Sequence, residues 1–397
     1  MSTLVLRKFT HIATLQRIGC RSLRELLEPY REFFAGRGLV LPPPAAGAEA
    51  VGGAGDRPEA ELDLKGLAEI FTAPDLDMPS GLVNTLYLLH AMSTPEAMEQ
   101  LLELAAAARP PLDLTGAESA PEVAVRVFLR QPALLEAVHE RFELSRPKLF
   151  FTYLTEREQV PELAVPTDAV RLAWEACLDR WFVKKKQGAG SRVLVYPRGR
   201  LCWFLIRHGD MLKLEETHAA NGETDSVTFR PQLHDVLIYD LDRGQLQIHT
   251  KTRGKRELYR KTFGEFLFQD AEYLPGDGKF TLRPFLEHGA AALDCGDMPE
   301  IEWAHLRELE FQRPGTGAEN RERVVHKAPD LFAVFAARQF VLGPDEVLTR
   351  AMIQIKFKGI KQARKVTITP ANRVSYLRDE VGKLVETFLR RRGFMLK

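Results

Sequence analysis

The residues of this chain that are best placed to do chemistry lie in one short hairpin pattern. Asp235 heads an apolar run, Val236–Tyr239, and a glycine-containing turn leads to a second run that ends in His249 and Lys251. Carboxylates can hold a metal ion, and a lysine can stabilise the negative charge that develops in hydrolysis. The hairpin is therefore a candidate catalytic site, and an ordinary structural hairpin is the alternative.

The hairpin resembles the core of the PD-(D/E)xK nuclease superfamily, in which an Asp heads one strand and an acid-x-Lys pair lies on the next. The resemblance covers residues 231–251 and implies Asp235 as the first Mg²⁺ ligand and Lys251 as the catalytic lysine. His249 stands where the family has its second acid. Because Mg²⁺ prefers oxygen ligands, this departure weakens the site. A working nuclease, an inactive relative and an ordinary hairpin all stay open.

Other signatures of cofactor or metal chemistry are absent from the sequence. It has no phosphate-binding Gly-x-x-x-x-Gly-Lys loop, no nucleophile elbow and no His-Glu-x-x-His pair. We therefore expect no cofactor, apart from Mg²⁺ if the nuclease alternative holds. The four cysteines are isolated, which predicts buried thiols in a reducing compartment and a cytoplasmic protein. They are Cys20, Cys177, Cys202 and Cys295.

The net charge of +1 hides an uneven distribution along the chain. Residues 1–165 carry 16 basic and 23 acidic side chains, whereas residues 351–397 carry 12 basic and 3 acidic ones. A basic tail behind an acidic front indicates that the tail meets a polyanion such as nucleic acid. The alternative is that the two ends complement each other within one fold.

Three basic clusters lie in the second half of the chain, and sets of Lys and Arg of this kind bind phosphates. Aromatic residues that could stack on bases lie near them in the sequence. Exposed faces of sheets are also commonly rich in lysine, which is the structural alternative. The candidate nucleic-acid-binding residues are Lys184, Lys185, Lys186, Arg192, Arg198, Arg200, Arg253, Lys255, Arg256, Lys356, Lys358, Lys361, Arg364, Lys365 and Arg373.

Composition and periodicity divide the chain into six segments. We expect an N-terminal helical segment at 1–41, a flexible Ala/Gly/Pro linker at 42–60 and a helical domain at 61–186. Short apolar runs split by Gly, Asp and Pro predict a mostly antiparallel β domain at 187–290. A loop-rich connection at 291–328 then leads to a basic α+β unit at 329–397.

The C-terminal unit has the clearest local pattern. Apolar residues alternate from Val347 to Phe357, which predicts a long half-buried strand that pairs with Lys365–Thr369. A final amphipathic helix is expected over Asn372–Arg392. In the β domain, Arg207–Asp210 is expected to be a hairpin turn that leaves its histidine in water. We expect the four tryptophans (Trp174, Trp181, Trp203 and Trp303) to anchor the core or a domain interface.

These patterns predict an α+β multidomain protein with an all-helical N-terminal region, a central β domain and a C-terminal β-hairpin-plus-helix unit. The function we favour is accessory, non-enzymatic nucleic-acid binding beside a protein partner that contacts the acidic helical domain. A setting in bacterial defence against foreign DNA is a further hypothesis. A Mg²⁺-dependent nuclease and a structural assembly subunit without nucleic acid are the alternatives. No apolar run reaches the roughly 20 residues that a membrane helix needs, so no membrane partner is expected.

Overall fold

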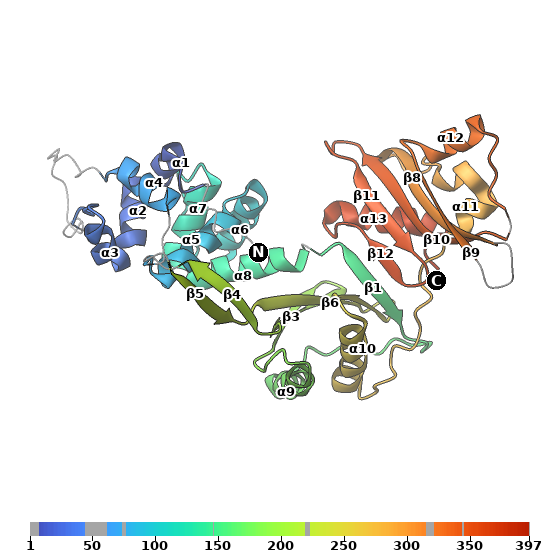
Figure 1. The fold of residues 1–397 in the computed structure, drawn as a ribbon, viewed down its shortest axis with the longest axis horizontal. Coiled ribbons are helices and arrows are strands. Elements are labelled where there is room, and N and C mark those ends of the chain that lie inside the picture. Colours follow the sequence, from blue (N-terminus) through green and yellow to red (C-terminus); the bar gives the residue numbers. More distant parts are fainter. Residues whose placement is uncertain are drawn as a thin grey trace. The chain divides into compact units, whose positions relative to one another are not determined.

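The computed structural model describes residues 8–43, 62–73, 77–145, 147–218, 223–314, 321–343 and 345–396. The chain forms two compact units, Met1–Phe142 and Glu143–Lys397. The first is helical and the second contains every strand in these ranges (Figure 1). The expected linker at 42–60 lies outside the described residues, apart from Pro42 and Pro43.

The first unit is a set of short helices around one apolar core. Helix α7 (Ala120–Arg130) is its centre, because it contacts α1, α2, α5 and α6 and buries Val123, Ala124, Val125 and Val127. Hydroxyl caps begin two of the helices: Thr94 accepts from the backbone N–H of Ala97 at 3.2 Å, and Ser119 accepts from that of Glu122 at 3.4 Å. The remaining elements are α1 (Ile12–Ile18), α2 (Cys20–Leu27), α3 (Arg31–Gly36), α4 (Leu64–Thr72), α5 (Ser80–Met92), α6 (Pro95–Ala107) and α8 (Pro132–Ser145).

The second unit is built on one antiparallel sheet of ten strands in the order β2-β3-β6-β7-β1-β12-β11-β10-β8-β9. Its first half holds β1 (Leu149–Leu154), β2 (Arg192–Arg198), β3 (Leu201–Gly209), β6 (Gln232–Asp240) and β7 (Gln245–His249). Its second half holds β8 (Ile301–Pro314), β9 (Arg321–Lys327), β10 (Val347–Phe357), β11 (Arg364–Thr369) and β12 (Arg373–Ser375). A separate two-stranded ribbon is formed by β4 (Lys213–His218) and β5 (Thr224–Phe229).

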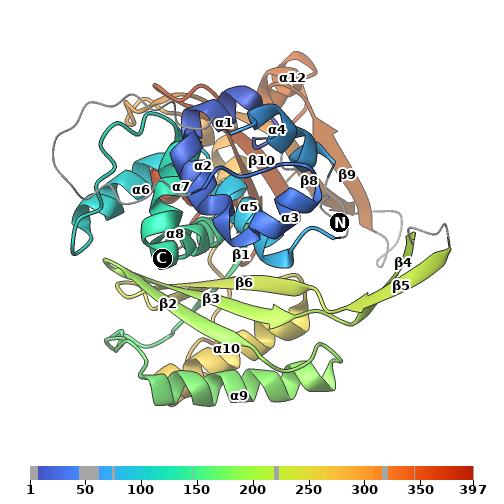
Figure 2. The ribbon, with the colours of Figure 1, turned by 90° about the vertical axis from the view of Figure 1, so that its left-hand side faces the viewer.

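Helices cover one face of the first half of the sheet. Helices α9 (Asp168–Lys184) and α10 (Arg253–Phe268) lie side by side beneath β2, β3 and β6 (Figure 2). Trp174 of α9 is fully buried, and its indole Nε1 donates to the hydroxyl of Thr262 in α10 at 2.9 Å. Phe204, Leu237 and Ile248 of the strands pack into the same core.

In the second half the helices lie on the opposite face. The strand register shows this, since paired residues point to the same side of a sheet. Phe151 packs on the α9–α10 side and is paired with Arg373, whereas Phe150 is paired with Val374. Val374 belongs to the core formed with α11 (Arg283–His288), α12 (Leu331–Ala337) and α13 (Glu380–Arg391). The face that carries Arg373 therefore has no helix from this core.

The predicted fold class is confirmed: helices come first, a large antiparallel sheet follows, and a strand-and-helix unit ends the chain. The alternating pattern from Val347 to Phe357 is β10, with Ile353, Ile355 and Phe357 buried. Residues 364–369 form β11 and pair with it as expected. The short apolar runs of the central region are strands β2 to β7.

Four local expectations differ from the structure. The segment 291–328, expected to be loop-rich, contains β8 and β9. The final helix begins at Glu380 instead of Asn372, because residues 373–375 add strand β12 to the sheet and Asp379 caps the helix. Residues 207–209 belong to β3 and are not a turn. Helix α9, expected in the helical domain, packs on the sheet, and the compact units divide after Phe142.

Helix length and hydropathy exclude one class of segment. Among the helices in the described ranges, none is both long enough and apolar enough to span a membrane.

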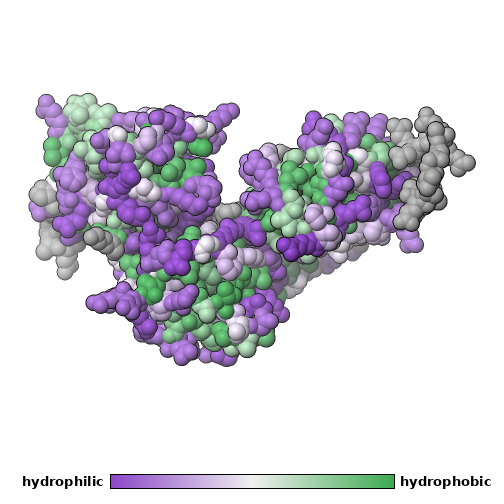
Figure 3. Space-filling model, turned by 180° about the vertical axis from the view of Figure 1, so that it is seen from behind, coloured by the Kyte–Doolittle hydropathy of each residue, from purple (hydrophilic) through white to green (hydrophobic). Residues whose placement is uncertain are grey.

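The face of the molecule seen in Figure 3 is largely hydrophilic, with smaller hydrophobic areas between the polar ones.

The contact between α9 and α10 generates a stability prediction. Replacing Trp174 with Ala removes a fully buried ring and its hydrogen bond, so we expect the second unit to lose about 3–5 kcal/mol of unfolding free energy. Replacing Leu172, which is 59% exposed on the same helix, with Ala serves as the control, with an expected change within about 0.5 kcal/mol. Hydrogen exchange of peptides from residues 143–397 measures both. Equal losses in the two variants would contradict this packing.

Candidate functional site

The three residues of the candidate catalytic hairpin do not converge. Val236 and His249 are paired across β6 and β7, so their side chains share one face of the sheet. Asp235 is the neighbour of Val236 on the same strand and therefore points to the other face. Lys251 follows β7 and is exposed. The strand geometry thus separates Asp235 from His249, and the pair does not form one metal site.

Asp235 lies in a buried polar cluster instead. Only 4% of the residue is exposed, and its Oδ2 atom lies 2.9 Å from His208 Nε2, 2.8 Å from the Tyr259 hydroxyl and 3.4 Å from Lys255 Nζ. His208 comes from β3, whereas Tyr259 and Lys255 come from α10. One carboxylate oxygen therefore ties two strands to a helix.

The electrostatics of this cluster keep Asp235 ionised. Burial raises the pKa of the carboxyl group, but the hydrogen bond from His208 and the charge of Lys255 outweigh it, so the pKa lies below its usual value. Burial and the neighbouring carboxylate raise the pKa of Tyr259 well above the ordinary phenol value. Tyr259 is therefore a permanent hydrogen-bond donor to Asp235.

The imidazole ring of His208 is fixed by hydrogen-bonding groups at both nitrogens and by an aromatic ring on one face. Its Nδ1 atom donates to the carbonyl oxygen of Gly209 at 2.6 Å, and Phe182 stacks on the ring with centroids 4.4 Å apart. The Nε2 atom lies between Asp235 and Lys255 Nζ, the latter at 3.0 Å. The expectation that this histidine sits in a wet turn is wrong, because it is 2% exposed inside a strand.

The chemistry of this arrangement is structural. Mg²⁺ needs several oxygen ligands with room for water, but the Asp235 oxygen already has three protein donors. Within the ranges that the structure describes, no group of three or more His, Cys, Asp or Glu side chains is placed to hold a metal ion. The hydrogen-bond partner of His249 is a backbone group. Its Nδ1 atom lies 2.8 Å from the carbonyl oxygen of Leu149 and therefore donates to it.

The first candidate basic cluster lies at the C-terminal end of α9. Lys184, Lys185 and Lys186 are exposed, and the Lys185 ammonium lies 5.7 Å from the centre of the Trp181 ring. The start of α10 approaches the same ring, which brings the exposed Arg253 to this end. Other members are committed elsewhere: Arg192 pairs with Glu175 at 3.3 Å, Arg200 with Asp242 at 2.7 Å, and Arg198 lies over Trp203.

The second cluster is divided by burial. Lys255 is 3% exposed and belongs to the Asp235 cluster, so the prediction that it binds nucleic acid does not fit its position. Arg256 is half-buried on α10, with its guanidinium 3.8 Å from the centre of the Phe151 ring. Arg373 of β12 approaches the same ring, at 6.0 Å. The structure thus brings a residue of the second cluster beside one of the third.

The third cluster divides between the two faces of the C-terminal strands. Arg364 forms an ion pair with Asp379 at 2.6 Å. Lys356 lies on the open face, and its ammonium donates to the carbonyl oxygen of Ile360. Lys358, Lys361 and Lys365 are exposed. Lys358 follows the end of β10 and so lies beyond its open face.

The open face of the C-terminal strands carries aromatic, amide and cationic side chains in register. His305, Gln354 and Lys365 are direct neighbours across β8, β10 and β11. Trp303 is paired with Lys356, two residues further along the same two strands, β8 and β10. The rings of Trp303 and His305 are in contact, with centroids 4.6 Å apart, and His305 donates to Asp330 at 2.8 Å. We call this set, with Arg373, the C-terminal platform. Its members are Trp303, His305, Gln354, Lys356, Lys365 and Arg373.

Acidic side chains on the same face lie toward β9 and are matched by cations. Glu308 pairs with Lys327 at 3.1 Å and with Arg350 at 3.3 Å, and Glu310 pairs with Arg323 at 2.7 Å. Their charge is therefore compensated locally, and the C-terminal platform keeps an excess of positive charge.

Sequence reasoning missed three of the platform residues. Trp303 and His305 were missed because their segment was expected to be a loop, and Gln354 was predicted only as a polar position of the alternating strand. Trp303 was expected to anchor a core or an interface, yet it is half-buried on the open face. The available signal was the alternation of apolar Ile301 and Leu306 with polar neighbours. That signal is blurred by a bulge, where the register between β8 and β10 shifts.

Comparison with known proteins gives no family for this chain. No protein-family model matches it, and no curated protein matches it at a significant level. The function must therefore be argued from the geometry.

The buried cluster predicts a strong energetic coupling. Asp235→Asn leaves Lys255 buried without a counter-charge, so we expect a loss of about 3–5 kcal/mol of unfolding free energy. The double variant Asp235→Asn, Lys255→Met removes both charges and should lose less than the single one. Asp242→Asn, which breaks an exposed pair with Arg200, is the control and should cost at most about 1 kcal/mol. Denaturant titration followed by circular dichroism measures all three, and a double variant that loses as much as Asp235→Asn, or more, would refute the coupling.

The same geometry predicts the outcome of a nuclease assay. Because Asp235 and His249 point to opposite faces, the purified protein should not cleave DNA or RNA in the presence of Mg²⁺. Cleavage of labelled strands is followed on denaturing gels, with and without a chelator. Robust chelator-sensitive cleavage that is lost in both Asp235→Asn and Lys251→Ala would overturn this.

Proposed function

We propose that this protein binds nucleic acid through the C-terminal platform and does so without cleaving it. The observation that carries the proposal is the cross-strand row His305–Gln354–Lys365 beside the Trp303–Lys356 pair. Aromatic rings, an amide and cations on one open sheet face are the groups that bind bases and phosphates.

The aromatic residues favour single strands over duplex. In a duplex the base faces are covered by their neighbours, so an aromatic side chain can stack only on an unpaired base. Trp303 and His305 are partly exposed on the open face of the sheet, and Gln354 lies beside His305, where it could contact a base edge. An amide reads bases through hydrogen bonds, while stacking tolerates any sequence, so weak sequence preference is expected.

Cations extend from the platform in two directions. Lys358 and Lys361 lie at the turn after β10 and are exposed, like Lys365 on β11. On the other side, Arg373 and Arg256 meet at the ring of Phe151. Neighbouring strands are about 4.8 Å apart, so the four strand spacings from β8 to β1 give a path of roughly 19 Å for a backbone.

A binding role without catalysis is supported by the Asp235 cluster. Asp235, which heads the nuclease-like hairpin, is already bound by three buried donors. His249, in the position of the second acid, points to the other face of the sheet. The hypothesis of a role in defence against foreign DNA began from that hairpin and stays a prediction.

An accessory role beside a protein partner completes the proposal. The acidic side chains of the first 165 residues would repel nucleic acid, so this part of the chain is better suited to contact a protein. A cytoplasmic location fits the four cysteines, which are all free thiols.

The proposal predicts binding that weakens with salt. Fluorescence anisotropy with labelled single strands should give a slope of roughly 0.7 in log affinity against log salt for each phosphate neutralised. Reversal of Lys358, Lys361 and Lys365 to Glu should remove most of the affinity and leave the fold intact, since exposed charges contribute little stability. Trp303→Ala should cost about 1–3 kcal/mol of binding to single strands and leave any duplex binding nearly unchanged.

A matched control carries the same change of net charge. Lys65, Lys213 and Arg283 are exposed and lie outside the platform, so their reversal to Glu should reduce affinity only slightly. Equal losses of affinity in both triple variants would mean that net charge, and not the position of the lysines, determines binding. If the wild-type protein binds neither duplex nor single strands at low salt, the proposal fails and the assembly-subunit alternative takes its place.

A further inference from the structure

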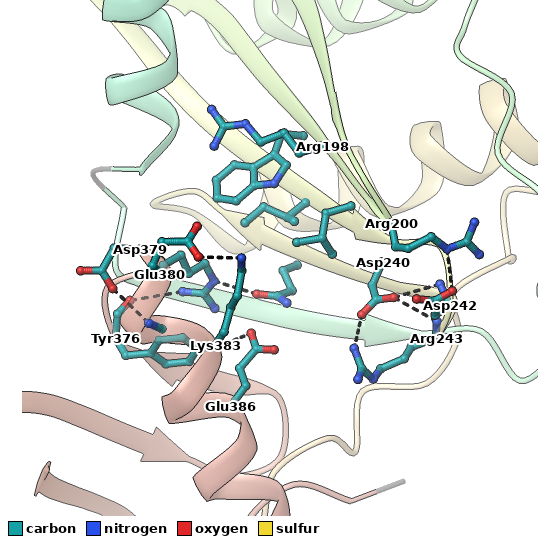
Figure 4. Close-up of a pocket in the computed structure, with 16 residues that line it drawn as sticks. Arg198, Arg200, Asp240, Asp242, Arg243, Tyr376, Asp379, Glu380, Lys383 and Glu386 are labelled. Carbon is teal, nitrogen blue, oxygen red and sulfur yellow. Dashed lines mark hydrogen bonds and ion pairs between the residues drawn. The ribbon is translucent and has the colours of Figure 1, made fainter. Parts of the chain in front are cut away.

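A pocket of about 380 Å³ lies in the second unit, on the face of the sheet opposite α9 and α10 (Figure 4). Its floor comes from β3 and β6, through the apolar side chains of Leu201, Trp203 and Ile238. The first turns of α13 and the segment before it form one wall, and the β6–β7 turn forms another. This volume lies within the range of small-molecule sites.

The rim of the pocket is a ring of ion pairs. Asp242 pairs with Arg200 at 2.7 Å and Asp240 with Arg243 at 2.5 Å, on the side of the β6–β7 turn. Figure 4 shows Glu380 and Lys383 on the opposite side, where they pair at 2.8 Å. Several of these side chains are largely exposed, including those of Arg200, Glu380 and Lys383. Exposed ion pairs contribute little stability, so a ligand can replace them at small energetic cost.

Arg378 is the least satisfied charge in the pocket wall. Its Nε atom donates to Gln247 at 2.9 Å and its Nη1 atom to the carbonyl oxygen of Lys148 at 3.1 Å. The guanidinium is clamped between the rings of Phe150, at 3.7 Å, and Tyr376, at 4.5 Å. Its Nη2 atom is buried and has no acceptor, and among the described residues it has no ion-pair partner. Burial lowers the pKa of Arg378, yet a guanidinium stays charged.

A second donor in the floor is also unmatched. Trp203 is 4% exposed, and its indole Nε1 is buried with no hydrogen-bond acceptor among the residues that the structure describes. A buried donor without a partner is destabilising, and the charge of Glu386 acts on Arg378 without forming an ion pair with it. Two such donors in one pocket indicate that an acceptor-bearing ligand completes it.

We propose that this pocket binds a nucleoside monophosphate. The phosphate would satisfy Arg378, and the base would lie on the apolar floor at the edge of Trp203. The rim carboxylates favour a ligand that also carries donors, such as ribose hydroxyls and base amino groups, over a simple anion. This site is separate from the C-terminal platform and does not depend on its function. The bound nucleotide can be a free molecule or the phosphorylated end of a strand.

Calorimetric titration of the full chain with AMP, GMP, CMP and UMP tests this assignment, with inorganic phosphate and the nucleosides as comparison ligands. We expect at least one monophosphate to bind and to raise the unfolding temperature. Arg378→Gln should weaken binding on the order of tenfold to a hundredfold, because it removes a charged donor. Trp203→Phe keeps the ring and loses the N–H, and should weaken binding several-fold. If Arg378→Gln does not fold, Trp203→Phe decides the question.

Lys261→Ala is the matched control, because it removes one exposed cation of α10 outside the pocket and should leave binding unchanged. The absence of binding by any monophosphate, unchanged affinity in Trp203→Phe, or phosphate alone binding as tightly would each overturn the proposal. Displacement by a short single strand with a 5′-phosphate identifies a strand end as the source, and its failure identifies a free nucleotide. Loss of strand binding in the platform variants, with monophosphate binding kept, would show that the two sites are independent.

Discussion

The backbone hydrogen bonds of strand β1 are the interaction on which the second unit depends. This six-residue strand pairs with β7 on one side and with β12 on the other, and the sheet order places it between a set of four strands and a set of five. Without it, β2-β3-β6-β7 and β12-β11-β10-β8-β9 would be separate sheets. Its register also decides which side chains share a face, since a shift of one residue would reverse every side chain. Phe150 and Phe151 therefore divide their contacts between the two faces.

The covering helices change sides at β1, and this change creates both candidate sites. On the face of Phe151, α9 and α10 cover the first half of the sheet, and the second half stays open as the C-terminal platform. On the face of Phe150, α13 and its neighbours cover the second half, and the bare strands of the first half form the pocket floor. Arg373 marks the first boundary and Arg378 the second, and each guanidinium rests on one of these two phenylalanine rings.

Local patterns predicted the strands of the central β region and of the C-terminal hairpin, but they missed β1, β8, β9 and β12 and predicted the sites poorly. The alternation in β10 is a property of neighbouring residues, so the sequence reveals which face is buried. The short strand β12 has three residues, and its existence depends on pairing with β1 more than 200 positions earlier, so the sequence pattern looked like the start of a helix. The same reason explains Asp235: His208, Tyr259 and Lys255 reach it from distant positions, and no local spacing announces a buried cluster. A site whose residues come together only through the fold of distant segments cannot be predicted from the pattern of neighbouring residues.

The excess of cations in the last 47 residues is partly an internal requirement of this topology. Arg364 holds the cap residue of α13, Lys383 pairs along the helix, and Arg391 with Arg392 binds Asp297 near α11. Arg378 is half-buried in the pocket wall. Among the described residues of this tail, the exposed cations without an ion pair are a smaller set: Lys358, Lys361 and Lys365, gathered at one end of the platform, and Arg390 on α13. The net charge of the tail therefore overestimates the positive surface that is available to phosphates. The position of each cation matters more than the count of twelve basic residues, and three exposed lysines lie beside an aromatic pair.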